Sequence, residues 1–265
     1  MKLFIMLRAL LIILLSQSCL SHEISVECES DTVGIICIFP DNVVSNSRLE
    51  ITFVITSNGL SSGEIESEAI VEFVVKNLTE FVPEKIGKHF KKIENLVIHS
   101  SALKFINRSD FADNLTQLEV LSLFNNKIET IPHDAFYDLP LLRHLDIENN
   151  LIKFLEPELL SHSIHLHVFA AGSNLIEEIH ENFFAHNSKL WKVMLNDNQI
   201  VDFRHNFQKR INNSENIRYF DLQHNPGLEC LKPLNLDMNE HVSSVRIKLF
   251  GFQYEIDDRC TGEYD

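Results

Sequence analysis

Four stretches of the chain share one eleven-residue pattern: 118–128 read LEVLSLFNNKI, 142–152 read LRHLDIENNLI, 166–176 read LHVFAAGSNLI and 190–200 read LWKVMLNDNQI. Each stretch has apolar residues at its first, fourth, sixth and eleventh positions and Asn at its ninth. The stretches start 24 residues apart. A fixed period of this length is typical of repeat proteins, so the pattern predicts a solenoid.

Weaker copies of the pattern extend the repeat in both directions. One begins at Ile93 and another at Ile217, and the earliest keeps only Val71, Phe73, Leu78 and Phe81. We therefore place the repeats at 67–228 and expect about seven of them.

The spacing has a physical reason. In a short strand alternate residues face one side, so Leu121 and Leu123 face a core together. The chain must then turn and return before the next strand, and the turn buries backbone groups that need partners. The Asn at positions such as 126 and 150 can supply them, to its own coil and to the neighbouring one.

The pattern resembles the extracellular leucine-rich-repeat family over about residues 70–230. The resemblance implies an α/β-type solenoid, a horseshoe with a parallel β-sheet on its concave face and a disulfide cap at each end. The degenerate first repeats and the ending at 217–228 look like the secreted short leucine-rich immune proteins of insects and the ectodomains of Toll-like receptors.

Residues 1–21 are typical of a secretory signal peptide. Lys2 and Arg8 supply positive charge, an apolar run ends at Leu15, and small residues stand at Cys19 and Ser21. The alternative is an uncleaved membrane anchor, for which the apolar run is short against about 30 Å of hydrocarbon. We expect cleavage after Ser21, secretion to the extracellular space and no stable membrane anchor.

Cleavage leaves an even number of cysteines in an oxidising compartment: Cys28, Cys37, Cys230 and Cys260. They stand in one pair near each end, within an N-terminal cap at 22–66 and a C-terminal cap at 229–265. In a stiff arc the two ends are too far apart to be bridged. We therefore expect the disulfides Cys28–Cys37 and Cys230–Cys260.

The charge excludes some partners. The formal net charge of −15 becomes −17 when Lys2 and Arg8 are removed with the leader. Such an acidic protein suits neither nucleic acid nor an anionic membrane surface. We expect an extracellular protein or glycan as partner, and a monomer is favoured although the oligomeric state is not fixed.

The expected binding surface is the concave sheet, where residues between the buried strand positions face outward. Its candidate contacts are Val97, His99, Ser122, Phe124, His144, Asp146, Glu148, Lys192, Met194, Asn196, Tyr219 and Asp221. Four sequons mark candidate glycosylation sites outside that face, at Asn77, Asn107, Asn114 and Asn212.

Catalysis and metal binding are weakly supported. His162, His165 and His167 lie close together in the sequence, and His144 would lie one coil away. No Cys or patterned carboxylate joins them, so we expect no metal and no cofactor. Phosphate loops and nucleophile motifs are missing from the sequence. We expect a non-enzymatic recognition protein of innate immunity; the alternative is a secreted adhesion, matrix or developmental module, since fold alone does not choose between them.

Overall fold

A computed structural model describes most of the repeat region and parts of both ends. The described residues are 22–30, 35–38, 51–57, 70–76, 82, 86–89, 92–112, 114–201, 219–226, 231–233, 246–247 and 254–256. The expected signal peptide, Cys230, Cys260, Asn77 and Asn212 lie outside them. No helix in these ranges is both apolar enough and long enough to span a bilayer.

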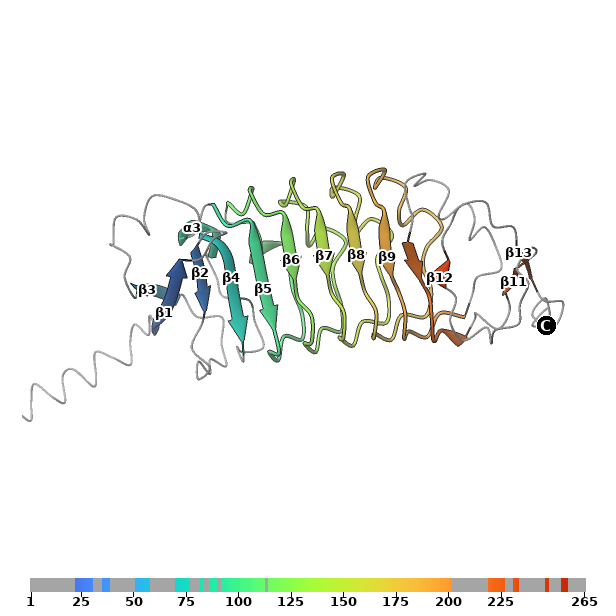
Figure 1. The fold of residues 1–265 in the computed structure, drawn as a ribbon, viewed down its shortest axis with the longest axis horizontal. Coiled ribbons are helices and arrows are strands. Elements are labelled where there is room, and N and C mark those ends of the chain that lie inside the picture. Colours follow the sequence, from blue (N-terminus) through green and yellow to red (C-terminus); the bar gives the residue numbers. More distant parts are fainter. Residues whose placement is uncertain are drawn as a thin grey trace, which may run out of the picture.

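Parallel strands form the body of the molecule (Figure 1). In chain order they are β4 (Ile70–Lys76), β5 (Asn95–His99), β6 (Val120–Ser122), β7 (His144–Asp146), β8 (Val168–Ala170), β9 (Lys192–Met194) and β10 (Tyr219–Asp221). Each pairs in parallel with the next, with Leu121 opposite Leu145 and Leu145 opposite Phe169. The 24-residue period of the sequence therefore becomes one strand per coil, in a parallel-sheet solenoid of about five turns. The expected seven repeats stay a prediction, because parts of the outer coils lie beyond the described residues.

At the N-terminal side the sheet continues into three further strands. They are β1 (His22–Ser30), β2 (Ile35–Ile38) and β3 (Ile51–Ser57), in the order β3-β1-β2-β4. β1 pairs antiparallel with β2, and this register sets Cys28 opposite Cys37. The two cysteines are thus backbone neighbours, and the disulfide between them stays a prediction.

The C-terminal side has three short strands. β12 (Arg246–Ile247) pairs antiparallel with β10 and covers its free edge, while β11 (Leu231–Pro233) pairs with β13 (Tyr254–Ile256) as a separate ribbon. An antiparallel strand on the last parallel one removes the open edge that would otherwise pair with other chains.

The core is a set of apolar columns with one member from each coil. The fourth and sixth positions of the pattern are buried throughout, as in Leu145 and Ile147, and so is the eleventh, as in Ile152. In the coil of β8 Phe169 replaces Leu, and the small Ala171 stands two residues later. Phe169 then packs against Phe183 and Phe184, with ring centroids 5.7 and 6.0 Å away.

The Asn at the ninth position joins each coil to its neighbour, which confirms the role expected for it. Asn150 Nδ2 donates to the carbonyls of Ile147 and Glu148 in its own coil and of Leu123 in the preceding one. Its Oδ1 accepts the N–H of Ile128, and Asn126, Asn174, Asn198 and Asn225 bond in the same manner. We call these five residues the Asn row.

Among the described residues, the chain between the parallel strands runs mostly through turns, and its α-helix lies between β4 and β5. In the described coils the chain returns through turns and one 3-10 helix, η1 (Arg108–Asp110), while the helix α3 (Ile86–His89) precedes β5. A 24-residue repeat leaves few residues for the return, and Pro132, Pro140 and Pro157 interrupt it. Proline lacks the N–H that a helix interior requires, so turns replace helices here.

Candidate functional site

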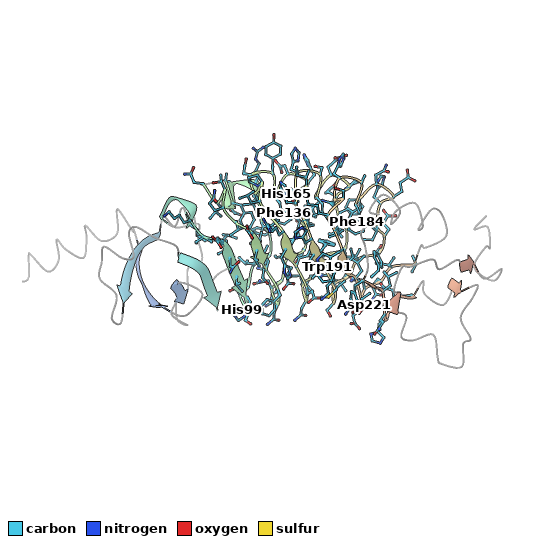
Figure 2. All side chains as sticks on the ribbon, turned by 45° about the horizontal axis from the view of Figure 1, so that its top comes forward. His99, Phe136, His165, Phe184, Trp191 and Asp221 are labelled. Carbon is cyan, nitrogen blue, oxygen red and sulfur yellow. The ribbon has the colours of Figure 1, made fainter. Side chains whose placement is uncertain are left out.

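The exposed side of the parallel sheet carries three columns of side chains, which we call the sheet face. The columns are formed by the third, fifth and seventh positions of the pattern, for example His144, Asp146 and Glu148 in one coil. Leu145 and Ile147 between them point into the core. In Figure 2, His99 and Asp221 mark opposite ends of the described part of this face.

The structure brings the candidate contacts together on this one surface, as the strand pattern predicts. Most are half-buried rather than fully exposed, including Val97, Phe124 and Met194, and Ser122 and Asp221 are buried. Neighbouring coils stand about 4.8 Å apart, so side chains in one column cover one another. Val97, Phe124 and Met194 are therefore only partly exposed on the sheet face.

The β5–β6 end of the sheet face is aromatic and apolar. The rings of His99 and Phe124 stack with centroids 4.8 Å apart and 5° between their planes. Val97 and Val120 stand in the neighbouring columns of the same two coils. A flat ring pair beside β-branched residues offers contact area with little conformational freedom to lose on binding.

The β7–β10 end is acidic and ordered by hydrogen bonds. Asp146 accepts the hydroxyl of Ser122 at 2.8 Å and the N–H of Glu148 at 3.0 Å. Asp221 repeats the arrangement, accepting the hydroxyl of Tyr219 at 3.0 Å and the N–H of Gln223 at 3.1 Å. These bonds fix both carboxylates in place on the sheet face.

Glu148 is held in an unfavourable electrostatic position. Burial raises the pKa of its carboxyl, the carboxylates of Asp146 and Asp221 raise it further, and Lys192 lowers it. Lys192 Nζ lies 5.3 Å from the ring centroid of Tyr219, and its charge acts on Glu148 against those of Asp146 and Asp221. The balance of charge in this half of the face is negative.

His144 lies beside this group and is kept neutral. Burial lowers the pKa of its imidazole, Asp146 raises it, and Lys192 lowers it. A neutral imidazole leaves the acidic group without a second cation at physiological pH.

Gly172 makes room for the acidic group. A Cβ built on Gly172 would stand 2.8 Å from Asn196 Oδ1 and 3.0 Å from Glu148 Oε1. The side chains of Glu148 and Asn196, from the coils on either side, thus lie over Gly172. A residue with a Cβ at this position would displace them.

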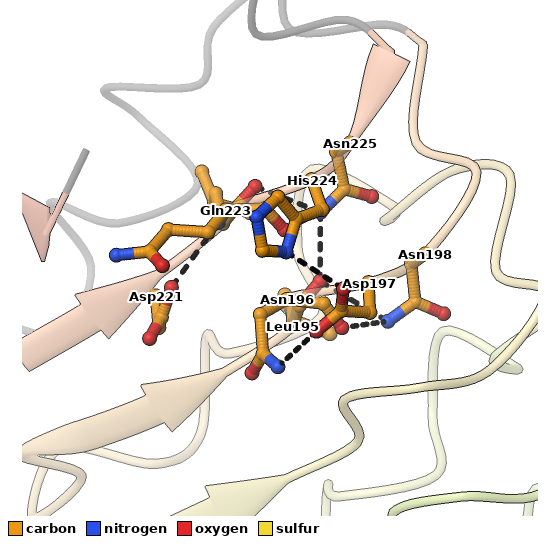
Figure 3. A network of polar contacts seen from close by, with 9 residues as sticks. Leu195, Asn196, Asp197, Asn198, Asp221, Gln223, His224 and Asn225 are labelled. Carbon is orange, nitrogen blue, oxygen red and sulfur yellow. Dashed lines mark hydrogen bonds and ion pairs between the residues drawn. The ribbon is translucent and has the colours of Figure 1, made fainter. Parts of the chain in front are cut away.

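A second polar row borders the sheet face, and the sequence analysis did not anticipate it. One residue per coil, just before the Asn row, has a positive φ of 52–59°: Ser100, Asn125, Asn149, Ser173, Asp197 and His224. Their side chains link coils, with Asn149 Nδ2 donating to Asn125 Oδ1 at 2.8 Å and His224 Nδ1 lying 2.7 Å from Asp197 Oδ1 (Figure 3). We call it the turn row. It could have been predicted from the polar residues at the eighth position of each pattern, which tolerate a positive φ.

The histidines considered for a metal do not form such a site among the described residues, where no group of three or more potential ligands is arranged for a metal. His165 Nδ1 instead lies 2.7 Å from Lys189 Nζ.

Two of the four sequon residues are described. Asn107 is half-buried beside η1, and Asn114 is exposed on the returning part of the same coil with a φ of 66°. Both stand away from the sheet face.

Comparison with known proteins finds relatives that share the repeats. A family model described as "Leucine rich repeat" matches residues 91–152 and 116–169. The chain is 27% identical to keratocan of Coturnix japonica over 199 residues, which cover 73% of this chain and 54% of keratocan. It is 35% identical over 72 residues to a probable glycoprotein hormone G-protein coupled receptor of Anthopleura elegantissima, covering 27% of this chain and 8% of the receptor. The chain thus spans about half the length of keratocan and a small part of the length of the receptor.

Solved structures agree on the fold. The LRIM1/APL1C complex superposes with a TM-score of 0.60 at 18% identity, covering 76% of this chain and 35% of that one. The repeat pattern, the parallel solenoid with its Asn row, and the family model over residues 91–169 show that this chain contains leucine-rich repeats.

Proposed function

We propose that this is a secreted, non-enzymatic recognition protein that binds an extracellular protein through its sheet face. The observation that carries the proposal is the placement of Glu148, a half-buried carboxylate beside two others. Like charges held together and partly removed from water oppose folding, and such costs concentrate at functional sites. A partner that presents a cationic group would offset that cost on binding.

The two halves of the sheet face together describe the partner. The carboxylates of Asp146, Glu148 and Asp221 fit a Lys or Arg side chain, and the stacked pair His99–Phe124 fits an apolar or aromatic group beside it. The Asn row and the turn row hold this surface on a rigid scaffold. Protein binding is also the common use of the leucine-rich-repeat solenoid, whose stacked coils create extended binding surfaces.

The biological role that we propose is innate immune recognition, supported by the resemblance of the repeats to secreted immune proteins and by the expected leader peptide. Induction of the transcript on infection would favour this role. Constant expression in a single tissue would favour adhesion or development instead.

The binding site is tested with the secreted protein as bait in extracellular fluid, followed by mass spectrometry of the captured proteins. Wild type and Glu158→Lys, an exposed change on the returning side, are expected to capture the same partner. Asp146→Lys with Glu148→Lys is expected to lose it while remaining folded, which a cooperative melting curve checks. Equal capture by all three proteins would exclude the sheet face as the site.

A further inference from the structure

The side of the solenoid at which the parallel strands end carries exposed apolar residues. This side lies along the lower edge of the sheet in Figure 1. We call it the strand-end flank, and its members in the argument are Lys104, Glu129, Leu151, Lys153, Phe154 and Glu177. Leu151 is 41% and Phe154 44% exposed. Both line an open hollow of about 420 Å³, together with Glu129 and Lys153. Adjacent exposed apolar groups rimmed by charges are typical of a protein interaction surface.

Four charged residues on this flank alternate in sign. Lys104, Glu129, Lys153 and Glu177 occupy the twelfth position in four successive coils. The Glu129 N–H donates to the Lys104 carbonyl at 3.0 Å and the Glu177 N–H to the Lys153 carbonyl at 3.3 Å, so they follow one another along the flank. Among the described residues, no ion pair engages Glu129, Lys153 or Glu177; the recorded pairs are Arg108–Asp138, Arg143–Glu119 and His224–Asp197.

An alternating row of four charges is complementary to itself when reversed. A two-fold axis between Glu129 and Lys153 sets Glu129 opposite Lys153 of a second copy, and Lys104 opposite Glu177 of that copy. A shift by one coil instead sets Glu129 opposite Glu177 and Lys153 opposite itself, and like charges across an interface cost several kcal/mol. A shift by two coils again opposes unlike charges but pairs only Lys153 with Glu177, so the first register is the one that pairs all four residues. That register also brings Leu151 and Phe154 close to the axis.

From this geometry we propose that the strand-end flank is the interface of a homodimer, with a second copy of this chain as its occupant. A two-fold interface uses the same patch on both subunits and requires that the patch be self-complementary, as this row is. The apolar pair at the axis supplies the attraction, and the charges set the register. The proposal departs from the monomer favoured on the sequence, and it is independent of the proposed function because the sheet face stays free in such a dimer.

The row also dictates a test by charge exchange. Glu129→Lys alone sets two cations opposite two cations at the axis, and Lys153→Glu alone sets two anions opposite two anions. Combining both changes in one chain restores opposite charges across the axis. Mixing the two single variants also restores them, but only between unlike chains.

The experiment is sedimentation velocity on the full secreted protein from about 1 to 100 μM, the affinity range suited to a small interface. Wild type and the double variant are expected to dimerise, each single variant to dimerise at least about tenfold more weakly, and an equimolar mixture of the singles to regain the wild-type affinity. Phe154→Ala should weaken the dimer, and Lys189→Glu, a charge reversal away from the flank, should not. Melting curves confirm that each variant is folded.

A monomeric wild type at the highest concentration would overturn the proposal. So would single variants that dimerise like wild type, or a mixture that stays monomeric. Partner capture by the sheet face, measured on the same flank variants, is expected to be unchanged, so failure of the dimer and failure of the proposed function are told apart.

Discussion

The imidazole of His99 lies flat on the ring of Phe124, with 4.8 Å between the ring centroids, and the two residues come from adjacent coils of the sheet face. Neither ring enters the core, which Leu121 and Leu123 fill from the same strand. The pair therefore adds to the surface that a partner would meet rather than to the packing beneath it.

Phe124→Asp is expected to reduce partner affinity by about tenfold or more, because a charge placed in the interior of an interface loses its water without gaining a counter-ion. Its free energy of unfolding should change by less than about 1 kcal/mol, since no core contact is removed. Affinity and melting temperature are measured on the same sample, with Lys189→Glu as control. Equal loss of affinity in both variants would place the site elsewhere.

Glu148→Gln is expected to raise the melting temperature at neutral pH and to lower partner affinity. The folded pKa of Glu148 is raised, so its favourable, protonated state is populated only at acidic pH, and its contribution to stability is lost as pH rises through that pKa. Gln keeps the shape without the charge. The gain in melting temperature should therefore disappear at acidic pH, where Glu148 is protonated, and a gain that is equal at all pH values would contradict this account.

Asn150→Ala is expected to lower the free energy of unfolding by about 1–3 kcal/mol, because buried backbone groups lose their partners. Asn150 is 5% exposed and bonds three carbonyls and one N–H. Asn182→Ala is the matched control, since Asn182 is exposed on the returning side. The two variants are compared by urea unfolding. Equal unfolding midpoints for Asn150→Ala and Asn182→Ala would show that the Asn row does not stabilise the fold.

The sequence was sufficient for those parts of the molecule that repeat. Strand positions, buried columns and the Asn row all follow from one local pattern, because each coil must satisfy the same burial and hydrogen-bonding needs. The α/β-type assignment left the form of the return open, and in the described coils the return runs mostly through turns, in line with Pro132, Pro140 and Pro157.

The features that could not be predicted from the sequence depend on contacts between side chains of neighbouring coils. The residues that face one another on the sheet face could be placed in columns, but the half-burial of Phe124 and the crowding of Glu148 over Gly172 follow from how side chains of neighbouring coils share space. The alternation of Lys104, Glu129, Lys153 and Glu177 was present in the sequence. Its meaning emerges only when these residues are seen side by side on one flank.

Ser173 in the turn row offers a test of backbone strain. Its φ is 53°, a left-handed conformation that β-branched residues adopt at a cost of about 1–2 kcal/mol. Ser173→Val is expected to lose that amount of stability, whereas Ser173→Gly should be tolerated. Gln199→Val, an exposed change just after the Asn row, is the control for adding an apolar side chain to the surface. Equal melting temperatures for the two Val variants would show that the turn is not strained.

Cys28 and Cys37 are expected to form the disulfide of the N-terminal cap. Directly opposed residues of an antiparallel pair have Cα atoms about 4.5–5.5 Å apart, which lies within the range of about 4.4–6.8 Å that a disulfide bridges. The register of β1 and β2 opposes these two residues. Peptide mapping without reduction should therefore recover a peptide that joins them.

Because such a bridge closes a short loop, replacing both cysteines by Ser should cost about 2–3 kcal/mol of stability. The double variant Cys28→Ser, Cys37→Ser is compared with wild type by urea unfolding under oxidising conditions. Under reducing conditions the two proteins should approach each other, which separates the effect of the bridge from that of the substitutions. A peptide joining Cys28 to Cys230 would contradict this pairing.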